Sequence, residues 1–346
     1  MIALPRRHPL ALLLAAVLPA ALASVAGCGK KEAPAPAEPA AKAAEAAPAA
    51  EAAPAEPEPS AGPPETTAGG DEDAGAAEPA YDPRQNAWGV ELRAADVAEG
   101  DRVYVLTKGR DRSMTDAKAV YQLFAHDVAG KEAELVDIAE VGGGKFRVAG
   151  NFVIKAGVAD AKSLEVGDAV LAEWASSLKH AVVIGFEGPA DAPEKVKVRY
   201  TDLPESWPDD KVIAARTPRE LTKLQEGLQP GVYALVHDDG RDRLVMLISE
   251  SGGTWLVQRF GGRVATFPAS ALTPVPLSPK LARGNAVRMP WVGMFMPGKV
   301  TKVKGTWVYA KVDGIGQKAP ISAAVGTVMP ESAMPKSEGA AAKPAP

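Results

Sequence analysis

The stretch that decides the fold is LEVGDAVLAEW, residues 164–174. An aliphatic residue, two variable positions and a glycine lead into a short apolar run. The same opening recurs three more times, and its glycines stand at positions 100, 167, 231 and 284, which are 67, 64 and 53 residues apart. Self-similarity at such intervals is typical of a repeat architecture in which each repeat is one small folded unit.

Each repeat has the period-two hydrophobic pattern of β-strands rather than the pattern of helices. Turn sequences such as Asp238-Asp239-Gly240 and Asp313-Gly314 separate the runs. The expected strands include 181–186, 195–200, 244–249, 254–260, 298–303 and 306–312. Five short strands in 50 to 65 residues suit a small SH3-like barrel. We therefore expect an all-β chain of three to four tandem SH3-like barrels, with one helix, Pro218–Leu228, joining the second to the third.

The second and fourth repeats also share aromatic residues at strand ends. The second has Trp174 after its glycine-led strand and Tyr200 after its third strand, and the fourth has the same kind of pattern. In this they resemble the Tudor/Agenet branch of SH3-like barrels. The resemblance implies an aromatic ligand site, in that family a cage for a methylated ammonium group. The candidate residues are Trp174, Tyr200, Trp291, Phe295, Trp307 and Tyr309.

The alternative is that these six rings fill the barrel cores, where aromatic side chains contribute much of the buried area. The first and third repeats lack the tryptophan at the end of the first strand, so the cage does not extend to them. Any cage in a secreted protein would serve a cationic or apolar group other than a histone-like ligand.

The N-terminus has the three parts of a secretory leader. Arg6 and Arg7 precede the apolar run Leu10–Val25, which is short for a membrane-spanning helix. The sequence Val25-Ala26-Gly27-Cys28 resembles a bacterial lipobox. That resemblance implies cleavage before Cys28 and a lipid anchor on it. Cys28 is the single cysteine of the chain, so an intramolecular disulfide and a thiolate metal cluster are excluded.

The residues after Cys28 form a segment rich in Ala, Pro and Glu, which predicts a disordered tether. Between 29 and 80 it has 3 basic and 11 acidic side chains, whereas residues 81–346 come to about +2. This near-neutral remainder argues against nucleic acid as a partner. The sequence thus divides into a signal peptide (1–27), lipidated cysteine and tether (28–80), barrels at 81–160, 161–225, 226–278 and 279–329, and a disordered tail (330–346).

Catalytic and metal-binding patterns are scarce in the sequence. His126, His180 and His237 have no metal-ligand spacing and are interpreted as surface or strand histidines. No nucleophile elbow occurs, and Gly142-Gly143-Gly144-Lys145 is followed by Phe146 rather than Ser or Thr, so a phosphate loop is excluded. We expect no enzyme, no cofactor and no metal site.

The expected function is non-catalytic binding by a lipoprotein of the cell envelope. A membrane contact would come through the lipid on Cys28. The ligand of the barrels would be a protein partner, with a peptidoglycan or other glycan of the cell wall as the alternative. Gly29 and Lys30 follow the cysteine without an aspartate, which by resemblance to enterobacterial lipoproteins implies the outer membrane, facing the periplasm, with display on the cell surface as the alternative.

Overall fold

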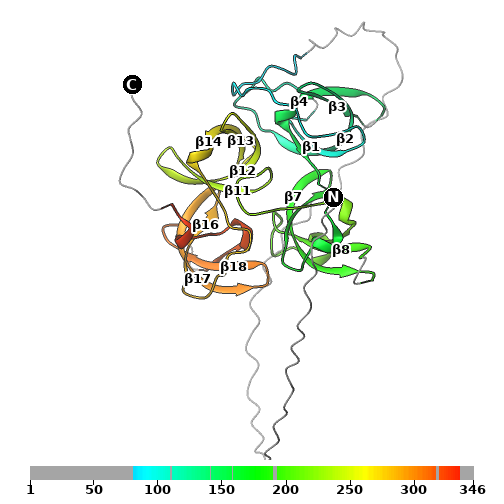
Figure 1. Cartoon of the computed structure of the whole chain (residues 1–346). Helices are drawn as coiled ribbons and strands as arrows, with labels where there is room; N and C mark the ends of the chain where they lie inside the picture. The colour runs from blue at the N-terminus through cyan, green and yellow to red at the C-terminus, as the bar shows by residue number, and fades with distance from the viewer. Residues whose placement is uncertain are drawn as a thin grey trace, which may run out of the picture. The chain divides into compact units, whose positions relative to one another are not determined.

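A computed structural model describes residues 81–335, except 110, 141, 158, 190–192 and 317–318. The leader, Cys28 and the tether lie outside the described residues, as does the tail after 335. Strands dominate what is described, and they close into four five-stranded SH3-like barrels (Figure 1). The expected all-β fold of tandem barrels is confirmed. No helix in the described part combines the length and apolar character that crossing a membrane requires.

Barrels 1 and 2 come first in the chain and share one order of five strands with a 3₁₀ helix before the fifth, to which barrel 2 adds the helix α1. Barrel 1 consists of β1 (Arg102–Thr107), β2 (Gln122–Glu132), β3 (Leu135–Ala139), β4 (Lys145–Ala149), the 3₁₀ helix η1 (Gly150–Phe152) and β5 (Val153–Lys155). After η2 (Ala161–Ser163), barrel 2 consists of β6 (Ala169–Trp174), β7 (Ser177–Glu187), β8 (Lys195–Tyr200), the short helix α1 (Asp209–Val212), β9 (Ile213–Arg216), η3 (Pro218–Glu220) and β10 (Leu221–Lys223).

Barrels 3 and 4 repeat that order. Barrel 3 consists of β11 (Tyr233–Asp238), β12 (Arg241–Ser251), β13 (Thr254–Arg259), β14 (Val264–Pro268), η4 (Ala269–Ala271) and β15 (Leu272–Pro274). Barrel 4 consists of β16 (Ala286–Trp291), β17 (Met294–Lys304), β18 (Trp307–Val312), β19 (Ile321–Ala324), η5 (Val325–Thr327) and β20 (Met329–Pro330), followed by η6 (Glu331–Ala333).

All four barrels have one topology. The second strand has 11 residues and is bent by a register shift, for example between Val183 and Gly185 in β7. Such bulges increase the local twist, so one long strand can pair with the first strand at one end and the third at the other. The first strand also pairs with the fifth, as Val105 does with Val153, and this pairing closes each barrel.

The structure corrects two expectations of the sequence. Residues 218–228 do not form a connecting helix: η3 ends at Glu220, and β10 follows at once and closes barrel 2. Residues 221–223, which follow η3, form a strand that pairs with β6 instead. Structure also continues past Met329, where the sequence predicts a tail, because Arg288 pairs with Glu331 and Met334 packs against barrels 3 and 4.

The barrels associate as two equivalent pairs. In barrels 1 and 2, the third residue of β2 pairs with the first residue of β7, Phe124 with Ser177. In barrels 3 and 4, the third residue of β12 pairs with the first residue of β17, Arg243 with Met294. The repeating unit of the chain is therefore a pair of barrels as well as a single barrel.

Apolar residues lie both inside the barrels and between them. In β1, Val103 and Val105 face the core of barrel 1, whereas Tyr104 and Leu106 belong to a cluster shared with barrel 3. Both faces of this strand are buried, so its sequence is almost continuously apolar. Trp88 extends the shared cluster, and its indole N–H donates to the Val264 carbonyl at 3.0 Å. This packing places residues of different barrels around common clefts.

Candidate functional site

One loop of barrel 2, residues 201–208, contacts barrels 3 and 4 and borders two of the clefts. It connects β8 to α1. Asp202 near its start faces barrel 3, while Glu205 and Trp207 lie towards barrel 4. The cleft beside Asp202 is named here the central cleft, and the cleft beside Trp207 the lateral cleft.

A buried polar network fixes the start of this loop. The Asp202 carboxylate accepts hydrogen bonds from the backbone N–H of His180 at 2.8 Å and from the Tyr233 hydroxyl at 3.0 Å. His180 Nδ1 lies 3.0 Å from the same carboxylate, and Nε2 lies 2.6 Å from the Gly231 carbonyl. The His180 and Tyr233 rings are stacked with their centroids 4.2 Å apart. These contacts join barrel 2 to the first strand of barrel 3.

Both ring nitrogens of His180 face acceptor atoms, an arrangement that suits a doubly protonated imidazolium. Burial alone lowers the pKa of His180, but the Asp202 carboxylate beside it reverses the effect and raises that pKa above 6.5. Burial likewise raises the pKa of Asp202, while the charge of His180 outweighs it and lowers the pKa below its ordinary value. His180 and Asp202 thus form a buried ion pair. The histidine is in a strand, as expected, but it is not on the surface.

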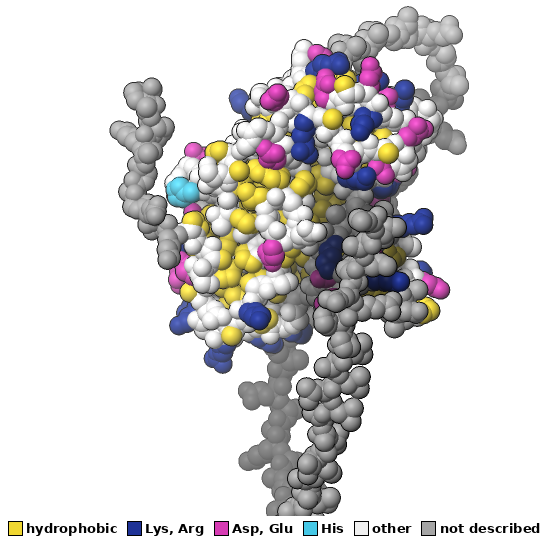
Figure 2. Space-filling model, viewed as in Figure 1, with side chains coloured by type: hydrophobic (Ala, Val, Ile, Leu, Met, Phe, Trp, Pro, Cys, Tyr) yellow, Lys and Arg dark blue, Asp and Glu magenta, His cyan; other side chains and the backbone are white. Residues whose placement is uncertain are grey.

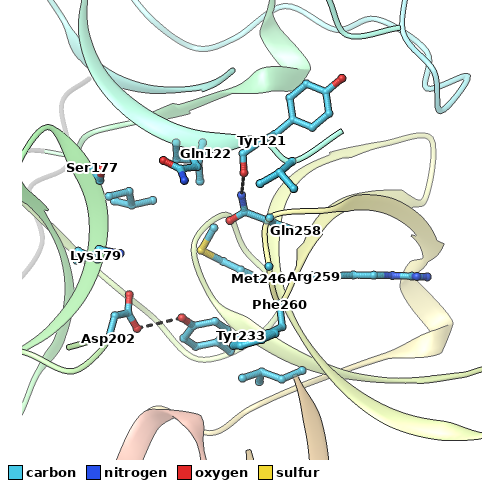
Figure 3. Close-up of a pocket in the computed structure, with 16 residues that line it drawn as sticks. Tyr121, Gln122, Ser177, Lys179, Asp202, Tyr233, Met246, Gln258, Arg259 and Phe260 are labelled. Carbon is cyan, nitrogen blue, oxygen red and sulfur yellow. Dashed lines mark hydrogen bonds between the residues drawn. The ribbon is translucent and has the colours of Figure 1, made fainter. Parts of the chain in front are cut away.

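The central cleft lies where barrels 1, 2 and 3 meet and has a volume of about 500 Å³. Gln122 of β2, Ser177 and Lys179 of β7, and Tyr233 of β11 line it, and Figure 3 shows them with the Tyr121 carbonyl directed to Gln258. Its polar groups largely satisfy one another, since Gln258 donates to the Tyr121 carbonyl at 2.7 Å and Tyr233 donates to Asp202. This cleft is in large part a structural junction.

The lateral cleft lies between barrels 2 and 4 and has a volume of about 750 Å³. Trp207, with 41% of its surface exposed, offers an accessible aromatic side chain there, and its ring lies 6.4 Å from that of Trp174. The Glu205, Arg199, Asp209 and Lys304 side chains provide charges around the indole; all four residues line this cleft. Small-ligand sites combine apolar or aromatic side chains with a few polar groups, and the lateral cleft provides both kinds.

The carboxylates of the lateral cleft already have partners. Glu205 accepts a hydrogen bond from the Tyr309 hydroxyl, and Asp209 pairs with Arg199 at 2.8 Å. Within the described residues, the Lys304 ammonium has no carboxylate within 4 Å. The charged group of this cleft that remains available to a ligand is therefore the Lys304 ammonium.

The structure separates the six aromatic residues that the sequence nominates. Trp174 and Tyr200 end strands of barrel 2 and pack on its core, Trp174 only in part. The Tyr200 hydroxyl donates to the Glu173 carbonyl at 2.6 Å and accepts from Arg216 Nε at 3.0 Å. Tyr200 is thus a buried core residue whose polar atom is satisfied within the barrel.

The four aromatic residues of barrel 4 occupy three different environments. Trp291 packs partly against the barrel core, and Phe295 is buried between barrels 3 and 4. Trp307 and Tyr309 lie on the outward face of β18 towards the 201–208 loop, which covers Trp307 to 8% exposure. The six rings do not meet in one cage, and Trp307 is the one among them that lines the lateral cleft.

Sequence reasoning missed Trp207, Arg199 and Lys304. Trp207 stands in the sequence Leu203-Pro204-Glu205-Ser206-Trp207-Pro208, which has no strand pattern. A tryptophan between prolines, outside any periodic run, was the available signal, because no barrel core needs it. Arg199 and Lys304 gave no local signal, since their roles depend on how barrel 2 packs against barrel 4.

Comparison with known proteins finds similarity to solved structures alone. No protein-family model matches the chain, and no curated protein matches it. The solved AGD34 structure of Arabidopsis thaliana AGDP1 is similar at 15% identity, over 42% of this chain and 88% of that one, with a TM-score of 0.21. The four MBT repeats of Drosophila melanogaster Sfmbt, in complex with the peptide RHR (me)K VLR, match at 8% identity over 69% and 89% of the two chains, with a TM-score of 0.15.

Proposed function

We propose that this chain is a non-catalytic binding protein of the bacterial cell envelope, whose ligand is a strand of cell-wall glycan held in the lateral cleft. The observation that carries the proposal is the exposed Trp207 indole among the charged side chains of Arg199 and Lys304. The apolar face of a sugar ring packs well on an indole, while its hydroxyls suit charged donors and acceptors.

The proposal includes a lipid anchor at Cys28 and a location at the outer membrane, facing the periplasm. The lipobox resemblance of residues 25–28 supports the anchor. A Pro-rich tether of 52 residues at roughly 3.1 Å per residue reaches at most about 160 Å. That reach lets a membrane-bound protein hold its barrels against the wall. Labelling cells with a radioactive fatty acid tests the anchor: the label is expected on the native chain and not on Cys28→Ala.

Co-sedimentation of the purified full chain with cell-wall sacculi tests glycan binding. Trp207→Ala is expected to remove most of the pelleted protein, because the stacking surface is lost. Phe186→Ala is the matched control, since Phe186 is 37% exposed on barrel 2 and lines none of the clefts described above. A native chain that stays in the supernatant, or equal losses for the two variants, would overturn the proposal.

A protein partner is the second candidate, and a different surface favours it. Phe260, Val292 and Val120 are 68%, 62% and 52% exposed. Phe260 packs closely over Gly293, next to Val292, and Val120 packs over Gly262, at the rim of the central cleft. Exposed apolar side chains gathered in this way are typical of protein–protein contacts. Cross-linking in cells through a photoreactive residue at position 260 tests this candidate: one discrete cross-linked product is expected, and none would exclude it.

A further inference from the structure

Positive charge is concentrated in the last barrel of the chain. Residues 279–335 contain eight basic and two acidic side chains, whereas residues 81–278 contain 24 basic and 29 acidic ones. Figure 2 shows the consequence: Lys and Arg side chains gather at the end of the molecule where Figure 1 draws β17 and β18, while both signs mix over barrel 1. The net charge near zero of the folded part conceals this separation.

The strand register places the lysines of barrel 4 on one face. Val308, Ala310 and Val312 of β18 fill the barrel core, so positions 307, 309 and 311 face outward. Their cross-strand partners on β17 share that face. The three outward pairs are Lys304 with Trp307, Lys302 with Tyr309, and Lys299 with Lys311. The four lysines of this set are named here the lysine face.

The lysine face has no counter-charge of its own. All four lysines are exposed, and in the described part of the chain no carboxylate lies within 4 Å of their ammonium groups. Lys299 and Lys311 are directly opposite each other, a like-charge arrangement that destabilises a sheet. Because this pair does not stabilise the fold, its presence indicates a functional role such as ligand binding.

The lysine face continues into the lateral cleft. Lys304 belongs to both, and Lys302 lies 5.8 Å from the ring of Tyr309, whose hydroxyl contacts Glu205 of the cleft wall. Since the carboxylates of the cleft are already engaged, a ligand that follows this path meets unpaired cations and the indole of Trp207. We propose that the lysine face and the lateral cleft together bind an anionic polysaccharide, its acidic groups on the lysines and a sugar ring on Trp207.

This inference rests on the proposed function of the lateral cleft and adds the charge of its ligand. An acidic protein segment, the acidic tether of this chain included, needs the lysines alone, whereas the exposed indole beside them suits a ring. Polygalacturonate is the probe for an anionic polysaccharide, dextran for a neutral one, and poly-L-glutamate for an acidic chain without sugars.

The experiment measures binding of the three polymers to the full chain by fluorescence anisotropy. Polygalacturonate is expected to bind, at least about tenfold more weakly in 300 mM than in 20 mM salt, because salt screens exposed charges. The double variant Lys302→Gln, Lys304→Gln is expected to weaken it about tenfold, and Trp207→Ala by a similar factor. The control Lys118→Gln, Lys162→Gln removes the same charge from two exposed lysines elsewhere and is expected to have no effect.

Three results would overturn the inference: dextran binding as tightly as polygalacturonate, full polygalacturonate binding by the Lys302/Lys304 variant, or poly-L-glutamate binding as tightly and independently of Trp207. The last result would assign the face to an acidic polypeptide. Sacculus binding that depends on Trp207 but not on the lysines would leave the proposed function standing and remove the anionic ligand. If the chain binds polygalacturonate but does not bind sacculi, the cell wall is excluded as the source of the ligand.

Discussion

Barrels 2 and 4 occupy equivalent places in the two barrel pairs, but their outward faces differ. On barrel 2, Lys197 pairs with Glu187 at 3.1 Å and Arg199 with Asp209 at 2.8 Å. The positions of Lys197 and Arg199 correspond to Tyr309 and Lys311 of barrel 4, because β8 and β18 have equal length and equivalent register. Barrel 2 pairs these two charges internally, whereas barrel 4 leaves Lys311 without a carboxylate partner among the described residues.

A second difference lies at the fourth residue of the long strand. In barrel 2 this residue is His180, which pairs with Asp202 and joins barrel 3. In barrel 4 it is Pro297, and Gly314 stands where Asp202 would be, two residues after the third strand. One topology therefore serves two purposes: barrel 2 is tied to its neighbour through a polar network, and barrel 4 presents a charged surface to the solvent.

The largest expected effect comes from breaking the network that barrel 4 lacks. Asp202→Ala leaves His180 buried without its counter-charge, and we expect a loss of about 3–5 kcal/mol in the free energy of unfolding. Urea unfolding followed by tryptophan fluorescence measures it. Asp209→Ala removes an exposed carboxylate from a surface pair and is expected to cost no more than about 1 kcal/mol. Equal effects of the two substitutions would contradict a buried ion pair.

The same network makes stability depend on pH. Because the pKa of His180 is raised in the folded protein, its stabilising contribution is fully present below its ordinary pKa of 6.5 and is lost as the pH rises through the folded value. We expect the unfolding free energy to fall as the pH rises above 6.5 and through the folded pKa, by less than Asp202→Ala costs. A series of urea unfolding curves at increasing pH measures the slope. His180→Gln cannot titrate, so an unchanged slope in that variant would assign the effect to other groups.

Tyr200→Phe tests a further difference between the two barrels, since the equivalent residue of barrel 4 is Val312. The substitution removes the hydroxyl that donates to the Glu173 carbonyl and accepts from Arg216 Nε, while Arg216 Nη2 still donates to that carbonyl at 2.8 Å. We expect a loss of about 0.5–1.5 kcal/mol, the usual net contribution of a hydrogen bond whose acceptor keeps a second donor. Thermal unfolding of the full chain measures it. An unchanged Tm would mean that water replaces the hydroxyl and that the end of barrel 2 is more open than its burial indicates.

The smallest expected effect would make barrel 4 more like barrel 2. Lys299→Glu turns the like-charge pair with Lys311 into an opposite-charge pair, and we expect a gain of about 0.2–1 kcal/mol in stability. The same variant is expected to bind polygalacturonate more weakly than the native chain. Denaturant midpoints and anisotropy, measured on one preparation, compare the two effects. A variant that gains stability and keeps its binding would show that Lys299 is not part of the ligand path.

The sequence predicts the barrels well because each barrel is built from local patterns. The glycine-led openings and period-two runs identify the strands from nearby residues alone. The expected helix at 218–228 failed because Thr217 and Glu220 form a capping box for a single 3₁₀ turn, after which Leu221 pairs with Ala172 of β6. A helical start signal was present, but a distant strand determined what followed.

The candidate site was predictable only in part, because it depends on packing between barrels. Trp307 was nominated as a cage residue and does line the lateral cleft, but the other five rings are distributed over cores, interfaces and the outward face of β18. Side-chain periodicity tells which face of a strand a residue occupies. It does not tell which neighbouring barrel covers that face, and the partners of His180 and Lys304 lie across such boundaries.

The apolar outer face of barrel 1 has a consequence for how the chain is made. Phe152 of η1 belongs to the apolar cluster that barrel 1 shares with barrel 3, and η1 lies against β12 of that barrel, whose first strand begins at Tyr233. Because the chain is synthesised from its N-terminus, barrel 1 is complete at β5. About 80 further residues must then be added before barrel 3 begins to form and can pack against it. During this interval of synthesis, barrel 1 is closed but part of its apolar outer face is still exposed to solvent. Substitutions that slow the folding of barrel 3 would then lower the yield of folded protein without changing its native structure.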